Sequence, residues 1–586
     1  ADLVANGGNW LRLLFYRSLY AFFHTVSLCR SPAFMHTTSR YAPILPAAKD
    51  WPVVQLNKHR RAFVQSVIDQ SVQTLLDQYP SEAARWSLLA KTLDAERARI
   101  KRQPWRVDPA DEQDFWQRVA VTVGGQRKIA PAIVLQRIVK RYAWEIAGRF
   151  RISHYRFVSR VATYTLARLL HPVKLVRPRL RSQLQDKLAA TIPIVGAVAQ
   201  LRQLARQGTI VIVPTHFSHL DSLLVGWVIN TLGLPPFIHG AGLNLYNSKF
   251  FAYFLDKLGT FKIDRRKKNL PYLTTLKAYS SLAIQQGCHS LFYPGGTRSR
   301  SGAIEQKLKL GLLETAVDAQ RCNYQTHGPA GRKIFVVPIV FNYAFVPEAL
   351  TLIQEHLAAQ GQSLPKDEAS AQSQLYDTFK LAATFLTKGS NITVSIGTPM
   401  DLLGNPVDEK GDSHGPQGEY IDFYTQFRQG ASPAEGQLKD EQYTKQLGEA
   451  ILKAYHKANC VLTSHLVAFV AFALIQKKNA TLAWDALIER PADSLLIPYA
   501  DFERNFGQLR AVLLQRAALG EIQVEQSLQA GDLAGAIQYG LDNLGIYHTK
   551  RPLVRNSAGD FTTQDLRTLL YYHNRLTGYD LEKHLA

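Results

Sequence analysis

The sequence is poor in cysteine and has no long uninterrupted apolar run. Its four cysteines are scattered through 586 residues without a CxxC spacing, at Cys29, Cys288, Cys322 and Cys460. This arrangement favours neither a zinc site nor a disulfide framework, and it fits a reducing, cytosolic compartment best. No stretch has the pattern of a signal peptide.

The longest apolar stretches are too short for a membrane-spanning helix, which needs roughly 18 or more uninterrupted apolar residues. The stretch 460–475 contains His465, and we expect it to form a buried helix. The stretch 10–29 is apolar and aromatic but contains Arg12 and Arg17, so we expect an interfacial helix. The sequence therefore predicts a protein that lies on a membrane without crossing it.

Acidic side chains are few relative to basic ones. The chain has 69 Lys and Arg against 47 Asp and Glu, a net charge of +22. Such an excess predicts a polyanionic partner, which could be a membrane surface, a nucleic acid or an acidic carrier protein.

Half of this net excess lies in the segment 137–181, which contains twelve basic residues and one acidic residue, Glu145. On anionic lipid, each well-placed cation contributes about 1 kcal/mol. The alternative is a nucleic-acid surface, with cations on phosphates and stacked aromatics, but no nucleic-acid-binding module accompanies the segment. The aromatic residues interleaved with the cations are Tyr142, Trp144, Phe150, Tyr155 and Phe157.

A chain of this length exceeds one compact core, so we expect several domains. Helical periodicity dominates residues 1–205, and residues 206–405 alternate short β-branched runs with helical stretches. Residues 406–439 form a loop-rich excursion, and residues 440–586 are helical again.

Strands separated by helices indicate an α/β fold with a mostly parallel sheet flanked by helices. The helical N-terminal and C-terminal regions would extend this central domain. The predicted strands are 209–214, 236–240, 260–264, 290–294, 333–341 and 392–397.

A histidine and an aspartate directly follow the first predicted strand. His216 and Asp221 fall where this strand ends and the next helix begins, the edge at which open α/β sheets keep reactive groups. A neutral histidine can remove a proton from an alcohol that attacks a carbonyl, while a carboxylate on its other nitrogen orients the ring. The spacing alone is better explained by a turn histidine before a helix-start acid. His219, between them, is expected to be structural.

A glycine-rich basic loop, GGTRSRSG at 295–302, follows the strand at 290–294. Glycine permits the positive φ that an anion-binding nest of backbone N–H groups needs, and Arg298 and Arg300 match phosphate oxygens. Each such charge-assisted bond contributes on the order of 1.5–3 kcal/mol. Taken alone, the loop equally fits a glycine turn with solvated arginines.

Two further segments leave strands at the same predicted edge of the sheet. Residues 259–268 end in four consecutive cations, from Arg265 to Lys268, which either form a solvated face or complete the anion pocket. Residues 337–343 have the pattern of a buried strand, and they would shape an acyl site.

Together, these segments resemble the glycerolipid acyltransferase family. Its signature is His-x4-Asp, Gly-x-x-x-Ile-x-Arg, a Gly-Thr-Arg-Ser loop and a Val-Pro strand, in this order. The resemblance is strong over residues 205–405 and weaker in the tail. The run His-x-Ser-His-x-Asp-x-Leu-Leu from His216 is similar to glycerol-3-phosphate acyltransferases of the long bacterial and mitochondrial type. The same type is favoured by segments 298–302, 309–311, 396–399 and 569–576.

The resemblance implies transfer of a fatty acyl group from acyl-CoA or acyl carrier protein to the 1-hydroxyl of glycerol 3-phosphate. His216 and Asp221 would be the catalytic pair, and no metal or tightly bound cofactor is implied. The expected location is the cytoplasmic side of the cell membrane, on anionic lipid and without a nucleic-acid partner. The implied substrate-binding residues are Arg265, Gly296, Thr297, Arg298, Ser299, Arg300 and Lys309.

Two residues depart from the family pattern. The third motif commonly has Glu where this chain has Gly295, which predicts a loop that is more mobile until phosphate binds. The second motif contains Asp264, a form commoner among lysophosphatidate acyltransferases, so lysophosphatidate is the alternative acceptor. The alternatives of another class are a basic nucleic-acid- or membrane-binding protein without catalysis and a scaffold that Gly295 has inactivated.

Overall fold

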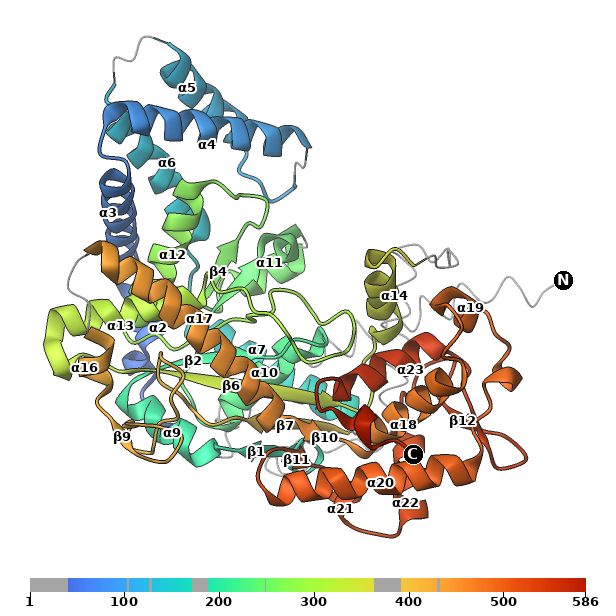
Figure 1. The fold of residues 1–586 in the computed structure, drawn as a ribbon. Coiled ribbons are helices and arrows are strands. Elements are labelled where there is room, and N and C mark those ends of the chain that lie inside the picture. Colours follow the sequence, from blue (N-terminus) through green and yellow to red (C-terminus); the bar gives the residue numbers. More distant parts are fainter. Residues whose placement is uncertain are drawn as a thin grey trace.

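The structure is a computed structural model, and Figure 1 shows its N-terminal helices (blue) and C-terminal helices (red) at opposite ends of a central sheet. The interfacial helix predicted for 10–29 lies outside the described residues, as does the part of the basic segment at 171–181. The described residues are 41–102, 105–125, 129–170, 188–247, 249–362, 391–428 and 433–586.

A seven-stranded sheet has the order β1-β7-β6-β2-β5-β3-β4. Neighbouring strands run parallel, except that β6 and β7 pair antiparallel. The predicted α/β fold with a mostly parallel sheet is therefore confirmed, with a strand at each predicted position. The strands are β1 (Ile194–Gly196), β2 (Thr209–Pro214), β3 (Ile238–Gly242), β4 (Thr260–Ile263), β5 (Ser290–Leu291), β6 (Ile334–Tyr343) and β7 (Ile392–Ile396).

The sheet begins before residue 206, where the α/β region was expected to start. Strand β1 pairs with β7, and helix α9 (Val198–Gln207) packs against β2. Because β1 has only three residues and one is glycine, the sequence offers no alternation by which a strand could be predicted there.

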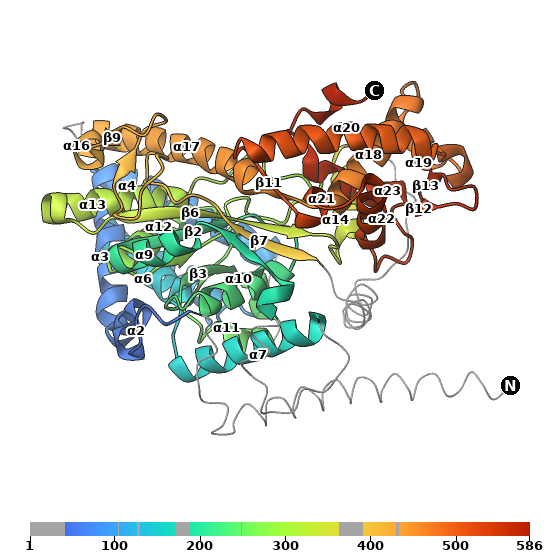
Figure 2. The ribbon, with the colours of Figure 1, turned by 90° about the horizontal axis from the view of Figure 1, so that it is seen from below.

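The central strands β2 and β6 are buried at every residue. Strands covered on both faces have continuous apolar sequences, which explains the runs TIVIVP and IFVVPIVF. Helix α17 (Pro433–Ala458) packs on β6 and α9 packs on β2, from opposite faces of the sheet (Figure 2). The chain beyond Pro214 therefore emerges from a rigid core at the carboxyl edge of the sheet.

The N-terminal helices form a second hydrophobic core with α12 (Leu270–Gln285), beside β3 and β4. This packing ties the N-terminal region to the β4 end of the sheet. These helices are α2 (Pro52–Lys58), α3 (Arg60–Gln78), α4 (Glu82–Arg102), α5 (Glu112–Gly124), α6 (Pro131–Ile146) and α7 (Ile152–Leu170).

The C-terminal helices share one continuous core with the sheet. Helix α18 (Thr463–Lys478) is buried along most of its length, which confirms the buried helix predicted for 460–475. Across the described ranges, no helix combines the length and apolarity needed to cross a bilayer. The remaining helices of this region include α16 (Phe423–Arg428), α19 (Trp484–Ile488), α20 (Tyr499–Ala518), α21 (Gln526–Gln529), α22 (Leu533–Asn543) and α23 (Leu566–His573).

Short loops and helices join the strands at the carboxyl edge. Helix α10 begins directly after the His216 turn, and α14 begins shortly after β6 ends. Both helices therefore start beside the chain that leaves β2. The connecting helices are α10 (Leu220–Thr231), α11 (Lys249–Leu255), α13 (Leu313–His327) and α14 (Ala349–Ala359).

Candidate active site

His216 lies two residues beyond β2, and its ring bonds to Asp221 in the first turn of α10. The Nδ1 atom of His216 is 2.7 Å from Oδ2 of Asp221. An Nδ1–H donor to this carboxylate leaves Nε2 as the unprotonated nitrogen, the form that a general base requires. The histidine side chain is 18% exposed while Asp221 is fully buried, so a substrate can reach only the imidazole of the pair.

Asp221 is held by more donors than its histidine. The backbone N–H groups of Phe217 and Ser218 donate to Oδ2 at 2.7 and 2.9 Å, and the hydroxyl of Tyr343 donates to Oδ1. Burial together with the nearby carboxylate of Asp221 raises the pKa of Tyr343, which keeps that hydroxyl protonated. Tyr343 ends β6 and had been expected only to shape the acyl site.

Tyr293, which follows β5, fixes the plane of the histidine. Its ring stacks on the imidazole of His216 with centroids 4.2 Å apart and planes inclined by 26°. Hydrogen bonding at Nδ1 and stacking on one face together hold Nε2 in a single direction. The sequence contained no signal for this contact, because β5 and β2 are adjacent only in the folded sheet.

The basic loop 295–302 contacts the histidine directly. The backbone N–H of Ser299 donates to the carbonyl of His216 at 2.7 Å. Gly296 has φ of +75°, and a Cβ there would lie 2.6 Å from Cδ of Lys309. The structure thus brings together the predicted residues His216, Gly296, Ser299 and Lys309.

Within the described residues, the side chains of the other predicted loop residues form no hydrogen bond with His216. The hydroxyl of Ser299 donates to the carbonyl of Ala303 at 2.7 Å, so this side chain shapes the loop itself. Thr297 is exposed. Arg300 is half exposed, and its Nε lies 3.3 Å from Glu355 on α14. Arg300 therefore lies at the α14 side of the loop.

Arg298 shares one carboxylate with the turn that contains His216 and Asp221. Its Nη1 lies 3.4 Å from Oε1 of Glu348, which precedes α14. Glu348 also accepts hydrogen bonds from the Ser218 hydroxyl at 3.0 Å and the His219 N–H at 3.1 Å. Glu348 therefore couples the guanidinium to the histidine turn, a role that the sequence did not indicate.

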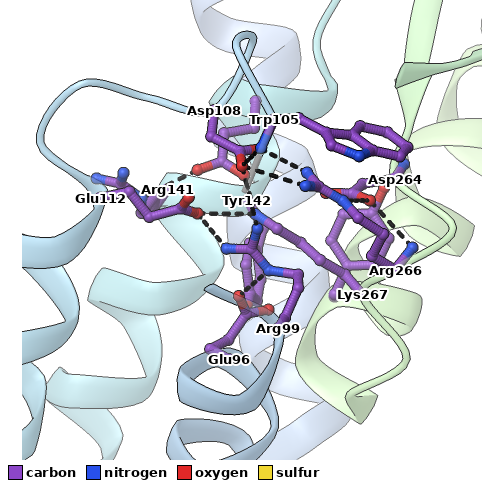
Figure 3. Close-up of polar contacts among 12 residues, drawn as sticks. Glu96, Arg99, Trp105, Asp108, Glu112, Arg141, Tyr142, Asp264, Arg266 and Lys267 are labelled. Atoms are coloured by element: carbon purple, nitrogen blue, oxygen red, sulfur yellow. Dashed lines mark hydrogen bonds and ion pairs between the residues drawn. The ribbon is translucent and has the colours of Figure 1, made fainter. Parts of the chain in front are cut away.

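The four consecutive cations after β4 do not act as one group. Arg266 forms ion pairs with Asp108 and Asp264, and Nζ of Lys267 lies 2.5 Å from Glu145 (Figure 3). Only Arg265 and Lys268 of the run are exposed. The prediction that the whole run could face an anion is therefore wrong, because two of its charges are neutralised internally; Arg265 stays open to a ligand.

The same ion-pair network joins the N-terminal helices to the β4 turn. Arg99 on α4 lies 2.7 Å from Glu96 and also pairs with Glu112, and the hydroxyl of Tyr142 donates to Glu96 at 2.9 Å (Figure 3). Asp264 accepts from Arg266 at 2.9 and 2.8 Å. Asp264, the residue that matches the form commoner among lysophosphatidate acyltransferases, is thus a structural partner of Arg266.

A cavity of about 650 Å³ lies beside this network, at the β4 end of the sheet. Its walls combine apolar and aromatic side chains with charged ones, and they do not include His216 or the 295–302 loop. The cavity is therefore separate from the histidine. Its lining includes Asp108, Ile146, Leu243, Tyr246, Tyr253 and Lys262.

The C-terminal region packs against the candidate site. A guanidinium nitrogen of Arg575 donates to the carbonyl of Phe341 and to Asn342, and its Cζ lies 3.6 Å from the ring centroid of Phe217. The amide of Asn574 donates to the carbonyl of Ser301 at 2.9 Å. The tail thus supports both the histidine turn and the basic loop.

Glu305, which no motif indicated, accepts a hydrogen bond from the backbone N–H of His216 at 2.8 Å. Burial raises the pKa of its carboxyl to about 7. The native state therefore keeps this proton to a higher pH than the unfolded chain. The associated stability is present below the ordinary carboxyl pKa and is lost as pH rises through about 7.

Glu305→Gln is accordingly expected to raise Tm relative to wild type at about pH 8 but not at about pH 5, because glutamine cannot ionise. Thermal unfolding of both proteins at the two pH values checks this. The same Tm difference at both pH values would contradict it.

Comparison with known proteins agrees with the resemblance found in the sequence. The family model described as Acyltransferase matches residues 197–342, which include His216 and the basic loop. A glycerol-3-phosphate acyltransferase of Pseudomonas paraeruginosa is 24% identical over 314 residues, 53% of this chain and 33% of its own. One of Ectopseudomonas mendocina is 26% identical over 394 residues, 64% of this chain and 43% of its own. The chain therefore spans less than half the length of these relatives.

Proposed function

We propose that this chain, whose residues 197–342 match the acyltransferase family model, transfers a fatty acyl group from an acyl thioester to the 1-hydroxyl of glycerol 3-phosphate. The donor is acyl-CoA or acyl carrier protein, and the products are lysophosphatidate and a free thiol. The observation that carries the proposal is the 2.7 Å bond of His216 to Asp221 beside the Arg298 loop. The names of the bacterial relatives support the acceptor.

The proposed chemistry uses His216 as the base. Its Nε2 takes the proton of the acceptor hydroxyl as the oxygen attacks the thioester carbonyl, and Asp221 stabilises the imidazolium that forms. Collapse of the tetrahedral intermediate breaks the carbon–sulfur bond, and the imidazolium returns its proton to the departing thiolate. In this proposal, backbone N–H groups of the loop near Gly296 would stabilise the oxyanion or the phosphate.

The phosphate of the acceptor would bind the cations around the basic loop. Arg298 is the first of these, because its guanidinium is already oriented by Glu348 beside the histidine turn. Lys309 lies against Gly296, and Arg265 and Arg300 would approach from the β4 and α14 sides. A bound phosphate would compete with Glu348 for Arg298, and the acceptor hydroxyl would then lie near Nε2.

No metal ion or tightly bound cofactor enters the proposed reaction, because the histidine supplies the proton transfer and the thioester supplies an activated acyl group. Within the described ranges, His, Cys, Asp and Glu side chains form no group of three that could hold a metal ion.

Purified protein should release thiol from an acyl thioester when glycerol 3-phosphate is added. Assays with glycerol 3-phosphate, with lysophosphatidate and with no acceptor distinguish the two candidate acceptors from each other and from a protein without catalysis. Turnover with lysophosphatidate but not with glycerol 3-phosphate would identify lysophosphatidate as the acceptor. The absence of acceptor-dependent thiol release from folded protein would overturn the enzymatic proposal.

We further propose that the protein is peripheral, on anionic lipid at the cytoplasmic side of the cell membrane. Within the basic segment, Arg137, Lys140, Arg149, Arg151 and Arg156 are exposed, and Trp144 is exposed beside them. Cations interleaved with an aromatic side chain fit the interface between headgroups and water.

Binding to vesicles with anionic phospholipid should exceed both binding to neutral vesicles and binding to duplex DNA at equal charge concentration. It should weaken as salt is raised, because the attraction is electrostatic. Stronger binding to DNA would favour the nucleic-acid alternative.

A further inference from the structure

The loop that lacks a carboxylate at Gly295 receives one from Glu305. A Cβ built on Gly295 would lie 3.0 Å from Cγ of Glu305 and 3.3 Å from its Oε1. The space beside Gly295 is therefore filled by the Glu305 side chain, and the absence of a side chain at 295 is what makes room for it. The loop is therefore packed against Glu305 at this point.

Among the described residues, the Glu305 carboxylate accepts a hydrogen bond from one other residue, His216. One carboxylate oxygen accepts the His216 N–H at 2.8 Å, and within the described residues the other is buried without a hydrogen-bond partner. Ionising a carboxyl in this position is unfavourable, as its raised pKa of about 7 shows. Burying an ionisable carboxyl here is unfavourable, and packing alone does not account for its presence.

The histidine is thereby held at three points. Glu305 accepts from its backbone N–H, the N–H of Ser299 donates to its carbonyl, and Asp221 bonds to its ring. Two of these three contacts come from the segment 295–305. The segment 295–305 and the histidine backbone are therefore joined by two hydrogen bonds.

We propose that Glu305 is a positioning residue, which fixes the backbone of His216 against the basic loop and replaces a carboxylate at position 295. This inference rests on the proposed acyl transfer. It also implies that positions 295 and 305 are interchangeable sources of one hydrogen-bond acceptor. An Oε1 that lies 3.3 Å from the Cβ position of residue 295 is within the reach of a glutamate placed there.

The test uses five variants of this chain, including Glu305→Gln, assayed for kcat and KM with glycerol 3-phosphate. Glu305→Ala should lower kcat by roughly 10- to 100-fold, because the histidine loses the backbone hydrogen-bond acceptor that sets its place. Gly295→Glu alone should also lower kcat, because two carboxylates would then occupy one buried position. The double variant Gly295→Glu with Glu305→Ala should recover most of the loss. The matched control, Gly295→Ala with Glu305→Ala, should not.

Glu305→Gln keeps an acceptor in place and should lose less activity than Glu305→Ala. Tm is measured for every variant, so that a fall in kcat is compared with folding. A purely structural role would make kcat follow Tm, whereas the proposal predicts that the glutamate at 295 restores kcat and the alanine does not.

Full activity in Glu305→Ala, or equal activity in the two double variants, would overturn the inference while leaving acyl transfer intact. If Glu305→Ala does not fold, the comparison of Gly295→Glu with Glu305→Gln decides: the proposal requires the former to be the less active. Failure of the wild type to turn over would instead refute the proposed function, and the two failures are thus distinguishable.

Discussion

His216→Ala should lower kcat for acceptor-dependent thiol release by about 10²- to 10⁴-fold, the usual contribution of a positioned general base. The loss should appear in kcat with KM for glycerol 3-phosphate little changed, because the imidazole acts on the hydroxyl in the transition state. Steady-state kinetics on purified protein measure both constants.

His219→Ala is the matched control, since His219 lies on the same turn but is exposed and contacts Glu348 through its backbone N–H. It should retain activity within roughly one order of magnitude. A His219 variant as inactive as the His216 variant would mean that the base has been misassigned.

Arg298→Ala should raise KM for glycerol 3-phosphate by about 10- to 100-fold, because a charge-assisted bond to phosphate contributes on the order of 1.5–3 kcal/mol. The KM for the acyl donor should change much less, since the proposal assigns the guanidinium to the phosphate of the acceptor. Titration of each substrate at saturating concentration of the other measures the two values separately.

Arg298→Lys, which keeps the charge but loses the planar pair of donors, should have an intermediate KM. Lys277→Ala removes an exposed cation that pairs with Glu314 on α13 and serves as the surface control. An unchanged acceptor KM in Arg298→Ala would place the phosphate elsewhere, with Arg265 as the next candidate.

The strands and the contact between His216 and Asp221 could be predicted because their signals are local. Continuous apolar runs mark buried strands, and the four residues between His216 and Asp221 fit one turn at a helix start. Strand β1 was missed because three residues carry no pattern, and the early start of α17 at Pro433 fell inside a segment rich in turn formers.

The supporting residues could not be predicted, because each reaches the turn 216–221 across the fold. Tyr293, Tyr343 and Glu348 come from strands or turns that become neighbours only when the sheet assembles, and Arg575 comes from the end of the chain. The prediction that the whole run from Arg265 to Lys268 could face an anion was wrong for a related reason. A sequence shows four charges, but it does not show the buried carboxylates that neutralise two of them.

The most direct test of the account is a structure of the protein with glycerol 3-phosphate bound. We predict that the phosphate contacts Arg298 and the loop at 295–302, and that the 1-hydroxyl lies within hydrogen-bonding distance of Nε2 of His216. A phosphate bound in the same loop with the hydroxyl directed away from His216, or a ligand bound only in the cavity beside β4, would contradict it.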